Sequence, residues 1–123
     1  MYGVNGKVLW ADLTNEKMWV EEIPEQIYKK YLAGVGLGSY ILNREIKNNI
    51  DALGPDNILG FVTGIFNSHN APLGGRLEVV DKSPMTGTWG DSNCGGKFAP
   101  ELKNTGFDAL FVKGIAKRPV YIK

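Results

Sequence analysis

Residues 6–23 read GKVLWADLTNEKMWVEEI, and this stretch decides the fold class. Residues 6–12 are predicted to form one strand and residues 17–23 a second, with turn-forming Leu-Thr-Asn-Glu between them. In the second segment Met18 and Val20 share one face, as alternate residues of a strand do. The stretch therefore predicts a β-hairpin.

Outward from the hairpin, the chain is expected to mix helices and strands. Pro24 precedes apolar residues at helical spacing, which predicts a helix closed by Gly34. A second helix is predicted after Gly38 and is expected to end near Asn48. Further strands are predicted at 58–63, 77–81, 86–90, 107–113 and 119–123, with a short helix at 100–104. The chain is thus assigned to the α+β class.

Composition is that of an ordinary globular domain. The 123 residues suggest a single domain, with 43% hydrophobic and 22% charged residues. The formal charge of +1 argues against nucleic acid or an anionic membrane as the main partner. We find neither an apolar run of membrane-spanning length nor the core of a signal peptide, so we expect a cytoplasmic protein without a membrane partner.

Glycine-rich residues 34–38 superficially resemble a dinucleotide-binding loop. Such a loop follows a strand, and its third glycine comes three residues after the second. Here a predicted helix precedes the segment and Ser39 occupies the position of that glycine. We therefore interpret the segment as a corner between two helices.

Residues 71–76, APLGGR, place Arg76 at the start of a predicted strand, directly after two glycines. A guanidinium group held on such a turn suits bidentate capture of a phosphate or a carboxylate. An arginine in a surface turn is more often structural, and the residues alone leave both interpretations open.

Residues 87–97, GTWGDSNCGGK, give the densest signal in the chain. Their small side chains predict a turn into a helix, where several backbone N–H groups and the helix dipole would seat a phosphate. The backbone carbonyl of Asn93 could face a cation, and Lys97 could add positive charge or be solvated. The alternative is a glycine-rich hairpin end without a ligand.

Two reactive residue types occur once each in the chain. Cys94 has no partner motif and is interpreted as a buried or bystander thiol, and one cysteine can form no intrachain disulfide, zinc Cys₄ site or iron–sulfur cluster. His69 lies in a polar stretch and is expected to be solvated or bonded to its own loop. We identify no catalytic residue.

An ordered series of short motifs over nearly the whole chain resembles the start of the aldehyde ferredoxin oxidoreductases. The series comprises Gly3 and Gly6, then 12–14, 32–34, 53–57, 71–76, 82–87, 93–96, 101–103, 106–109, 112–116 and 119–122. The resemblance implies an α+β, β-rich domain of layered, mostly antiparallel sheets with a few short helices.

The resemblance also implies a function for the whole enzyme. These enzymes are much longer than 123 residues. They bind tungsten, or molybdenum, through two molybdopterins, and they oxidise aldehydes to carboxylic acids. A [4Fe–4S] cluster passes the electrons to ferredoxin. The first domain is the base on which the bis-pterin rests, and later domains supply the cluster cysteines and most of the substrate pocket.

Carried over by motif, the predicted cofactor-binding residues are Arg76, Asn93, Cys94, Gly95 and Gly96. The resemblance makes Arg76 the pterin-phosphate arginine. It gives the backbone carbonyl of Asn93 to a magnesium ion between two pterin phosphates, with Gly95 and Gly96 in the adjacent turn. Cys94 stands where small residues are usual and is not interpreted as a cluster ligand.

Two alternatives remain open: another reaction on the same scaffold, such as aromatic thioester reduction, and a non-catalytic standalone binding or assembly domain. The charge role of the 34–38 corner is also open, because Val35 stands where many members carry an arginine. Since the chain ends within a predicted strand, we expect a truncated N-terminal cofactor-binding domain. Alone it should be inactive, hold no metal and self-associate through surface that other domains would cover.

Overall fold

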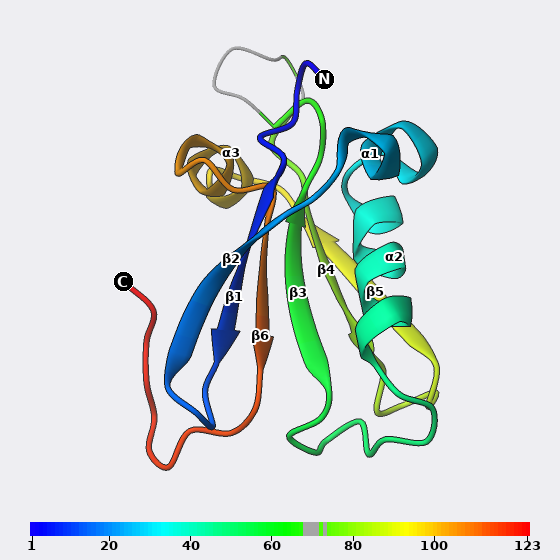
Figure 1. Ribbon diagram of the computed structural model, residues 1–123, viewed down its shortest axis with the longest axis vertical. Helices are drawn as coiled ribbons and strands as arrows, with labels where there is room; N and C mark the ends of the chain where they lie inside the picture. The colour runs from blue at the N-terminus through cyan, green and yellow to red at the C-terminus, as the bar shows by residue number, and fades with distance from the viewer. Residues whose placement is uncertain (68–71, 73) are drawn as a thin grey trace.

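The computed structural model describes residues 1–67, 72 and 74–123 and shows a six-stranded sheet with helices on both faces (Figure 1). In chain order the elements are β1 Lys7–Asp12, β2 Lys17–Glu22, α1 Glu25–Tyr31, α2 Val35–Glu45, β3 Ile58–Thr63, β4 Leu77–Lys82, β5 Trp89–Cys94, α3 Phe98–Asn104 and β6 Ala109–Lys113.

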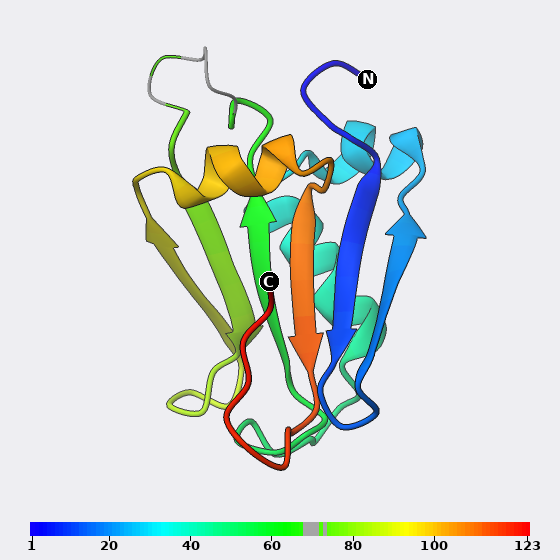
Figure 2. The same ribbon diagram turned by 90° about the vertical axis from the view of Figure 1, so that its left-hand side faces the viewer.

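The strand order is β2-β1-β6-β3-β4-β5, and only the β1–β6 pair is parallel. The last strand of the chain is therefore inserted between the first hairpin and the β3–β4–β5 meander (Figure 2). The predicted α+β class with mostly antiparallel pairing is confirmed, and the described strands form a single sheet.

The hairpin is confirmed, and it is tied to α2 through one carboxylate. Trp10 lies opposite Trp19, and their rings stack with centroids 5.6 Å apart. The Trp10 indole N–H donates to Glu21 at 2.8 Å, and Arg44 of α2 pairs with the same carboxylate at 2.7 Å. Burial alone would raise the pKa of Glu21, but these two bonds outweigh it and the pKa is lowered.

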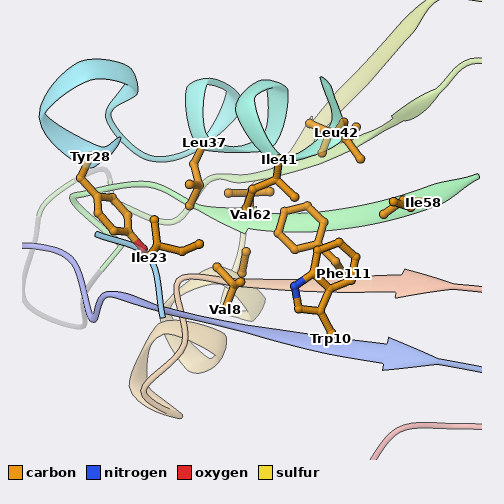
Figure 3. Packing of buried hydrophobic residues seen from close by; sticks show 12 residues of the cluster. Val8, Trp10, Ile23, Tyr28, Leu37, Ile41, Leu42, Ile58, Val62 and Phe111 are labelled. Carbon is orange, nitrogen blue, oxygen red and sulfur yellow. The ribbon is translucent and has the colours of Figure 1, made fainter. Parts of the chain in front are cut away.

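Helices α1 and α2 cover one face of the sheet and enclose the core (Figure 3). Phe111 is fully buried and stacks on Trp10 with centroids 5.0 Å apart. Gly60 makes room for that ring, because a β-carbon there would lie 2.5 Å from it. Each large apolar side chain buried in this way stabilises the fold by about 1.5–3 kcal/mol.

The opposite face is covered by helix α3 only at one end (Figure 2). Phe98 of α3 packs near Phe61, with centroids 6.1 Å apart. The C-terminal segment crosses the remaining part, in front of the strands. There Leu9 pairs with Leu110, and Leu59 is 39% exposed. This face therefore keeps accessible apolar surface.

The predicted helix–helix corner is confirmed, but the predicted helix boundaries are wrong. Leu32, at φ 62°, ends α1, and Gly34 precedes α2 instead of closing α1. Helix α2 begins before Gly38 and includes Gly36, where a β-carbon would lie 1.8 Å from the Tyr31 carbonyl oxygen. Glycine inside the helix thus permits the close approach of the two helices.

Two predicted strands differ from the structure. The strand expected at 86–90 begins later in the chain, as β5, because residues 84–88 form a turn. Two backbone hydrogen bonds of 2.8 Å close this turn: the Ser83 N–H donates to the Thr88 carbonyl, and the Gly87 N–H donates to the Ser83 carbonyl. Residues 119–123 form no strand. The segment pairs with neither edge strand of the sheet, β2 or β5, and passes over the sheet face instead (Figure 2). None of the helices in the described ranges is long and apolar enough to span a membrane.

Candidate functional site

The structure brings the predicted phosphate residues together where β4 begins and β5 ends. Strand pairing sets Leu77 opposite Cys94 and Glu78 opposite Asn93. Arg76 precedes this ladder, and its guanidinium Nη1 donates a hydrogen bond to the side-chain Oδ1 of Asn93. The arginine therefore turns toward the strand that leads into the glycine bend.

The bend itself consists of Gly95 and Gly96, between β5 and α3. Gly96 has φ 120°, a conformation that side-chain-bearing residues rarely adopt. The predicted turn into a helix is present, although a strand precedes it. Because α3 has only seven residues, an anion seat here would depend on the exposed bend and Arg76 more than on a helix dipole.

The two glycine pairs of the site have different surroundings. A β-carbon built on Gly95 or Gly96 would meet nothing within 4 Å, so the space beside the bend is open. A β-carbon on Gly75 would lie 2.9 Å from the carbonyl oxygen of Gly96, so these backbones pack closely. An open, backbone-lined space beside a guanidinium fits the phosphate of a larger ligand.

The chain is similar to known proteins. The family described as Aldehyde ferredoxin oxidoreductase, N-terminal domain, matches residues 8–123. The chain belongs to the aldehyde ferredoxin oxidoreductase family. The resemblance drawn from its motifs is thus confirmed.

The curated relatives of this aldehyde ferredoxin oxidoreductase domain are much longer proteins. It is 43% identical over 122 residues to the tungsten-containing aldehyde ferredoxin oxidoreductases of Pyrococcus furiosus and Thermococcus kodakarensis. These alignments cover 99% of the chain and 20% of each relative. The chain therefore spans about a fifth of the length of the curated relatives it matches.

Other similar proteins carry the domain under different names. The chain is 38% identical over 125 residues to an aliphatic sulfonate oxidoreductase, WOR-like subunit, of Pyrococcus furiosus, covering 99% of the chain and 20% of the relative. The active site complex BamBC of benzoyl coenzyme A reductase, solved with 1,5-dienoyl-CoA, superimposes with a TM-score of 0.89 at 29% identity. That match covers 98% of this chain and 18% of the other.

Acidic groups lie close to the arginine of the oxidoreductase domain. The pKa of Glu78 is raised, first by burial and then by the nearby Asp91 carboxylate, while Arg76 opposes the shift. A phosphate bound by Arg76 would therefore also lie near the Glu78 carboxylate, which in turn lies near that of Asp91. Positive and negative side chains so close together favour an anion that binds together with a cation.

Asn67 is a site residue that sequence reasoning missed. It is 3% exposed, its Oδ1 accepts from the Gly64 N–H, and its Nδ2 donates to the Gly74 carbonyl. It thereby fixes the backbone two residues before Arg76. The only signal for it was an asparagine in a polar loop, which is common in turns.

The other sequence candidates do not form a second centre. Cys94 is exposed, which excludes the buried-thiol interpretation, and the described residues contain no group of three or more His, Cys, Asp or Glu that could hold a metal. Lys97 is exposed and caps the start of α3 through its backbone, so its charge is available to solvent or ligand. His69 lies outside the described residues, as do Ala71 and Leu73 of the arginine segment.

Proposed function

We propose that this chain is the N-terminal cofactor-binding domain of a tungsten or molybdenum bis-pterin aldehyde:ferredoxin oxidoreductase, and that it anchors the cofactor by its phosphates. The observation that carries the proposal is the contact of Arg76 with Asn93 beside the open Gly95–Gly96 bend. When bound, the cofactor supplies two-electron oxidation of an aldehyde to a carboxylic acid, with water providing the oxygen.

Arg76 has the leading part in anchoring. Its planar guanidinium would bind the phosphate, and Asn93 would hold the guanidinium in place through the side-chain hydrogen bond. The amides of Gly95 and Gly96 are proposed to complete the seat, because both residues are exposed and the space beside them is open. The domain thereby orients the cofactor and forms one wall of the active site.

A magnesium ion fits the charge pattern of this seat. Two phosphates bring several negative charges to a place that already holds Glu78 and Asp91, so a divalent cation would relieve their repulsion. Magnesium prefers oxygen ligands, and the Asn93 backbone carbonyl is our candidate. We infer no direct carboxylate ligand.

The remaining parts of the reaction lie outside this chain. With Cys94 as its one cysteine, the chain cannot hold a four-cysteine [4Fe–4S] cluster, so we place those ligands in other domains of the enzyme. Ferredoxin is the proposed electron acceptor and the cytoplasm the proposed location. The isolated chain is expected to lack both cofactor and activity.

A second candidate function is another oxidation or reduction on the same base. Two similar proteins support this second candidate by their names: an aliphatic sulfonate oxidoreductase and a benzoyl coenzyme A reductase complex. Substrate profiling of the full-length protein separates the candidates: aldehyde oxidation supports the first, and activity confined to sulfonates or aromatic thioesters supports the second.

Metal and pterin analysis of the full-length protein tests the anchoring role. We expect Arg76→Ala and Gly95→Val to lose most bound pterin and metal, because one removes the guanidinium and the other fills the open bend. Arg118→Ala, at an exposed arginine outside the site, is the control and should keep both. Full pterin and metal content in both site variants would overturn the proposal.

A further inference from the structure

We propose that Asn67 is a positioning residue that sets where Arg76 stands for phosphate binding. The inference rests on the proposed phosphate-anchoring function. The side chain of Asn67 bonds to the backbone of Gly64 and Gly74, so its influence on Arg76 runs through the backbone.

The clamp joins two segments that are ten residues apart. The Asn67 side chain accepts from the N–H of Gly64, which directly follows β3, and donates to the carbonyl of Gly74, just before Arg76. Both side-chain groups are used in a buried position, where an unsatisfied amide costs about 1–3 kcal/mol. The side chain therefore has one strongly preferred placement.

Gly64, the inner end of the clamp, is held by a buried ion pair. Lys103 Nζ donates to the Gly64 carbonyl at 3.3 Å and to Asp108 at 2.6 Å. Asp108 is fully buried and also accepts from the Tyr28 hydroxyl at 2.7 Å and the Gly6 N–H at 2.7 Å. Asn67 thus links this buried part of the core to Gly74.

Gly74, the outer end of the clamp, lies against the phosphate seat. The next residue, Gly75, passes so close to Gly96 that a β-carbon on it would lie 2.9 Å from the Gly96 carbonyl oxygen. Arg76 follows and reaches Asn93. Because this packing has little free space, a shift of Gly74 moves the arginine relative to the bend.

Asn57 offers a matched control on the same pair of strands. It stands at the opposite end of β3 and β4, donates from Nδ2 to the carbonyls of Ala52 at 2.8 Å and Lys82 at 2.9 Å, and accepts from the Ile58 N–H at 2.8 Å. Its replacement by alanine removes a similar set of side-chain-to-backbone bonds. That loss should destabilise the chain without reaching Arg76.

The experiment compares Asn67→Ala, Asn67→Asp, Asn57→Ala and Arg76→Ala in the ¹⁵N-labelled chain, with inorganic pyrophosphate as the probe. Asn67→Ala should weaken pyrophosphate binding about three- to thirtyfold, the usual range for coupling through a network. Asn67→Asp keeps the acceptor for Gly64 but loses the donor to Gly74, and it should weaken binding in the same direction. Asn57→Ala should lower the melting temperature about as much as Asn67→Ala does. It should leave the affinity for pyrophosphate within about twofold of the wild-type value.

A ligand-free readout keeps the two proposals distinguishable. Asn67→Ala should shift the NMR signals of the Arg76 side-chain N–H and the Gly96 amide, whereas Asn57→Ala should not. Unmoved signals, or equal effects of the two asparagine changes on affinity, would overturn the positioning role. Wild-type binding no tighter than that of Arg76→Ala would instead overturn phosphate anchoring by this chain, while the signal shifts still decide the role of Asn67.

Discussion

The backbone of Gly75 packs directly against that of Gly96, so closely that a β-carbon on Gly75 would lie 2.9 Å from the Gly96 carbonyl oxygen. This contact joins the segment that carries Arg76 to the bend that follows Asn93. Sequence separates the two glycines by a whole hairpin, β4 and β5, and the pairing of Leu77 with Cys94 brings them together. The proposed phosphate seat thus depends on strand register.

The Gly75–Gly96 contact makes Gly75→Ala a sharp test of close packing. The added methyl group meets a backbone atom that cannot rotate away, so we expect a loss of about 1–3 kcal/mol in the free energy of unfolding, measured with urea. Gly95→Ala is the control, because its methyl group would meet nothing within 4 Å and should change stability by less than about 0.5 kcal/mol. Equal losses in the two variants would contradict the packing described here.

The buried Lys103–Asp108 pair supports a second prediction. Lys103→Met leaves the fully buried Asp108 carboxylate without its cation, which should cost about 3–5 kcal/mol in chemical denaturation. Lys113→Met is the matched control: its ammonium lies 3.9 Å from Asp12 on the surface, and its loss should cost at most about 1 kcal/mol. Similar costs for the two lysines would show that the buried pair contributes no more than a surface one.

Glu78 supports a prediction with a defined pH dependence. Its pKa is raised in the folded chain, first by burial, so the charged form is disfavoured there compared with the unfolded chain. The stability it contributes is present below its unfolded pKa and is lost as pH rises through its folded pKa. Glu78→Gln should therefore stabilise the chain at pH 7 and make little difference near pH 4, as urea denaturation at the two pH values would show.

The same substitution should also affect the phosphate seat. Removing a carboxylate from beside Arg76 should strengthen pyrophosphate binding at pH 7 about two- to threefold, the scale of one solvent-screened charge pair. Glu22→Gln, on the strand at the other edge of the sheet, is the control and should leave the affinity unchanged. Weaker binding in the Glu78 variant would mean that its carboxylate holds the arginine in place instead of competing for it.

Local patterns in the sequence were sufficient to predict the hairpin, the helix–helix corner and the glycine bend. Residues 6–23 carry their own turn, and the adjacent glycines Gly95 and Gly96 are typical of a bend. The strand expected at 119–123 is wrong: the segment joins neither edge strand, although β2 and β5 are each paired on one side only. Local pattern holds no information about whether a segment finds a partner strand.

Long-range polar contacts were beyond sequence reasoning for a similar reason. The partners of Asp108 include Tyr28, 80 residues away, and the backbone N–H of Gly6, 102 residues away. Nothing in the local sequence marks a buried aspartate as their common acceptor. The clamp made by Asn67 was hidden in the same way, since its meaning depends on where Gly64 and Gly74 end up in the fold.

The partly covered sheet face yields the last prediction, that the isolated chain self-associates. Leu59 is 39% exposed and Val20 49% exposed on the face that carries α3, and apolar strand surface of this kind tends to associate. The double variant Val20→Lys, Leu59→Lys should shift light scattering at high concentration toward the monomer. Leu53→Lys, at a loop residue that is 78% exposed, should not. If the wild-type chain stays monomeric at high concentration, the exposed apolar residues on this face do not drive self-association, and the prediction is wrong.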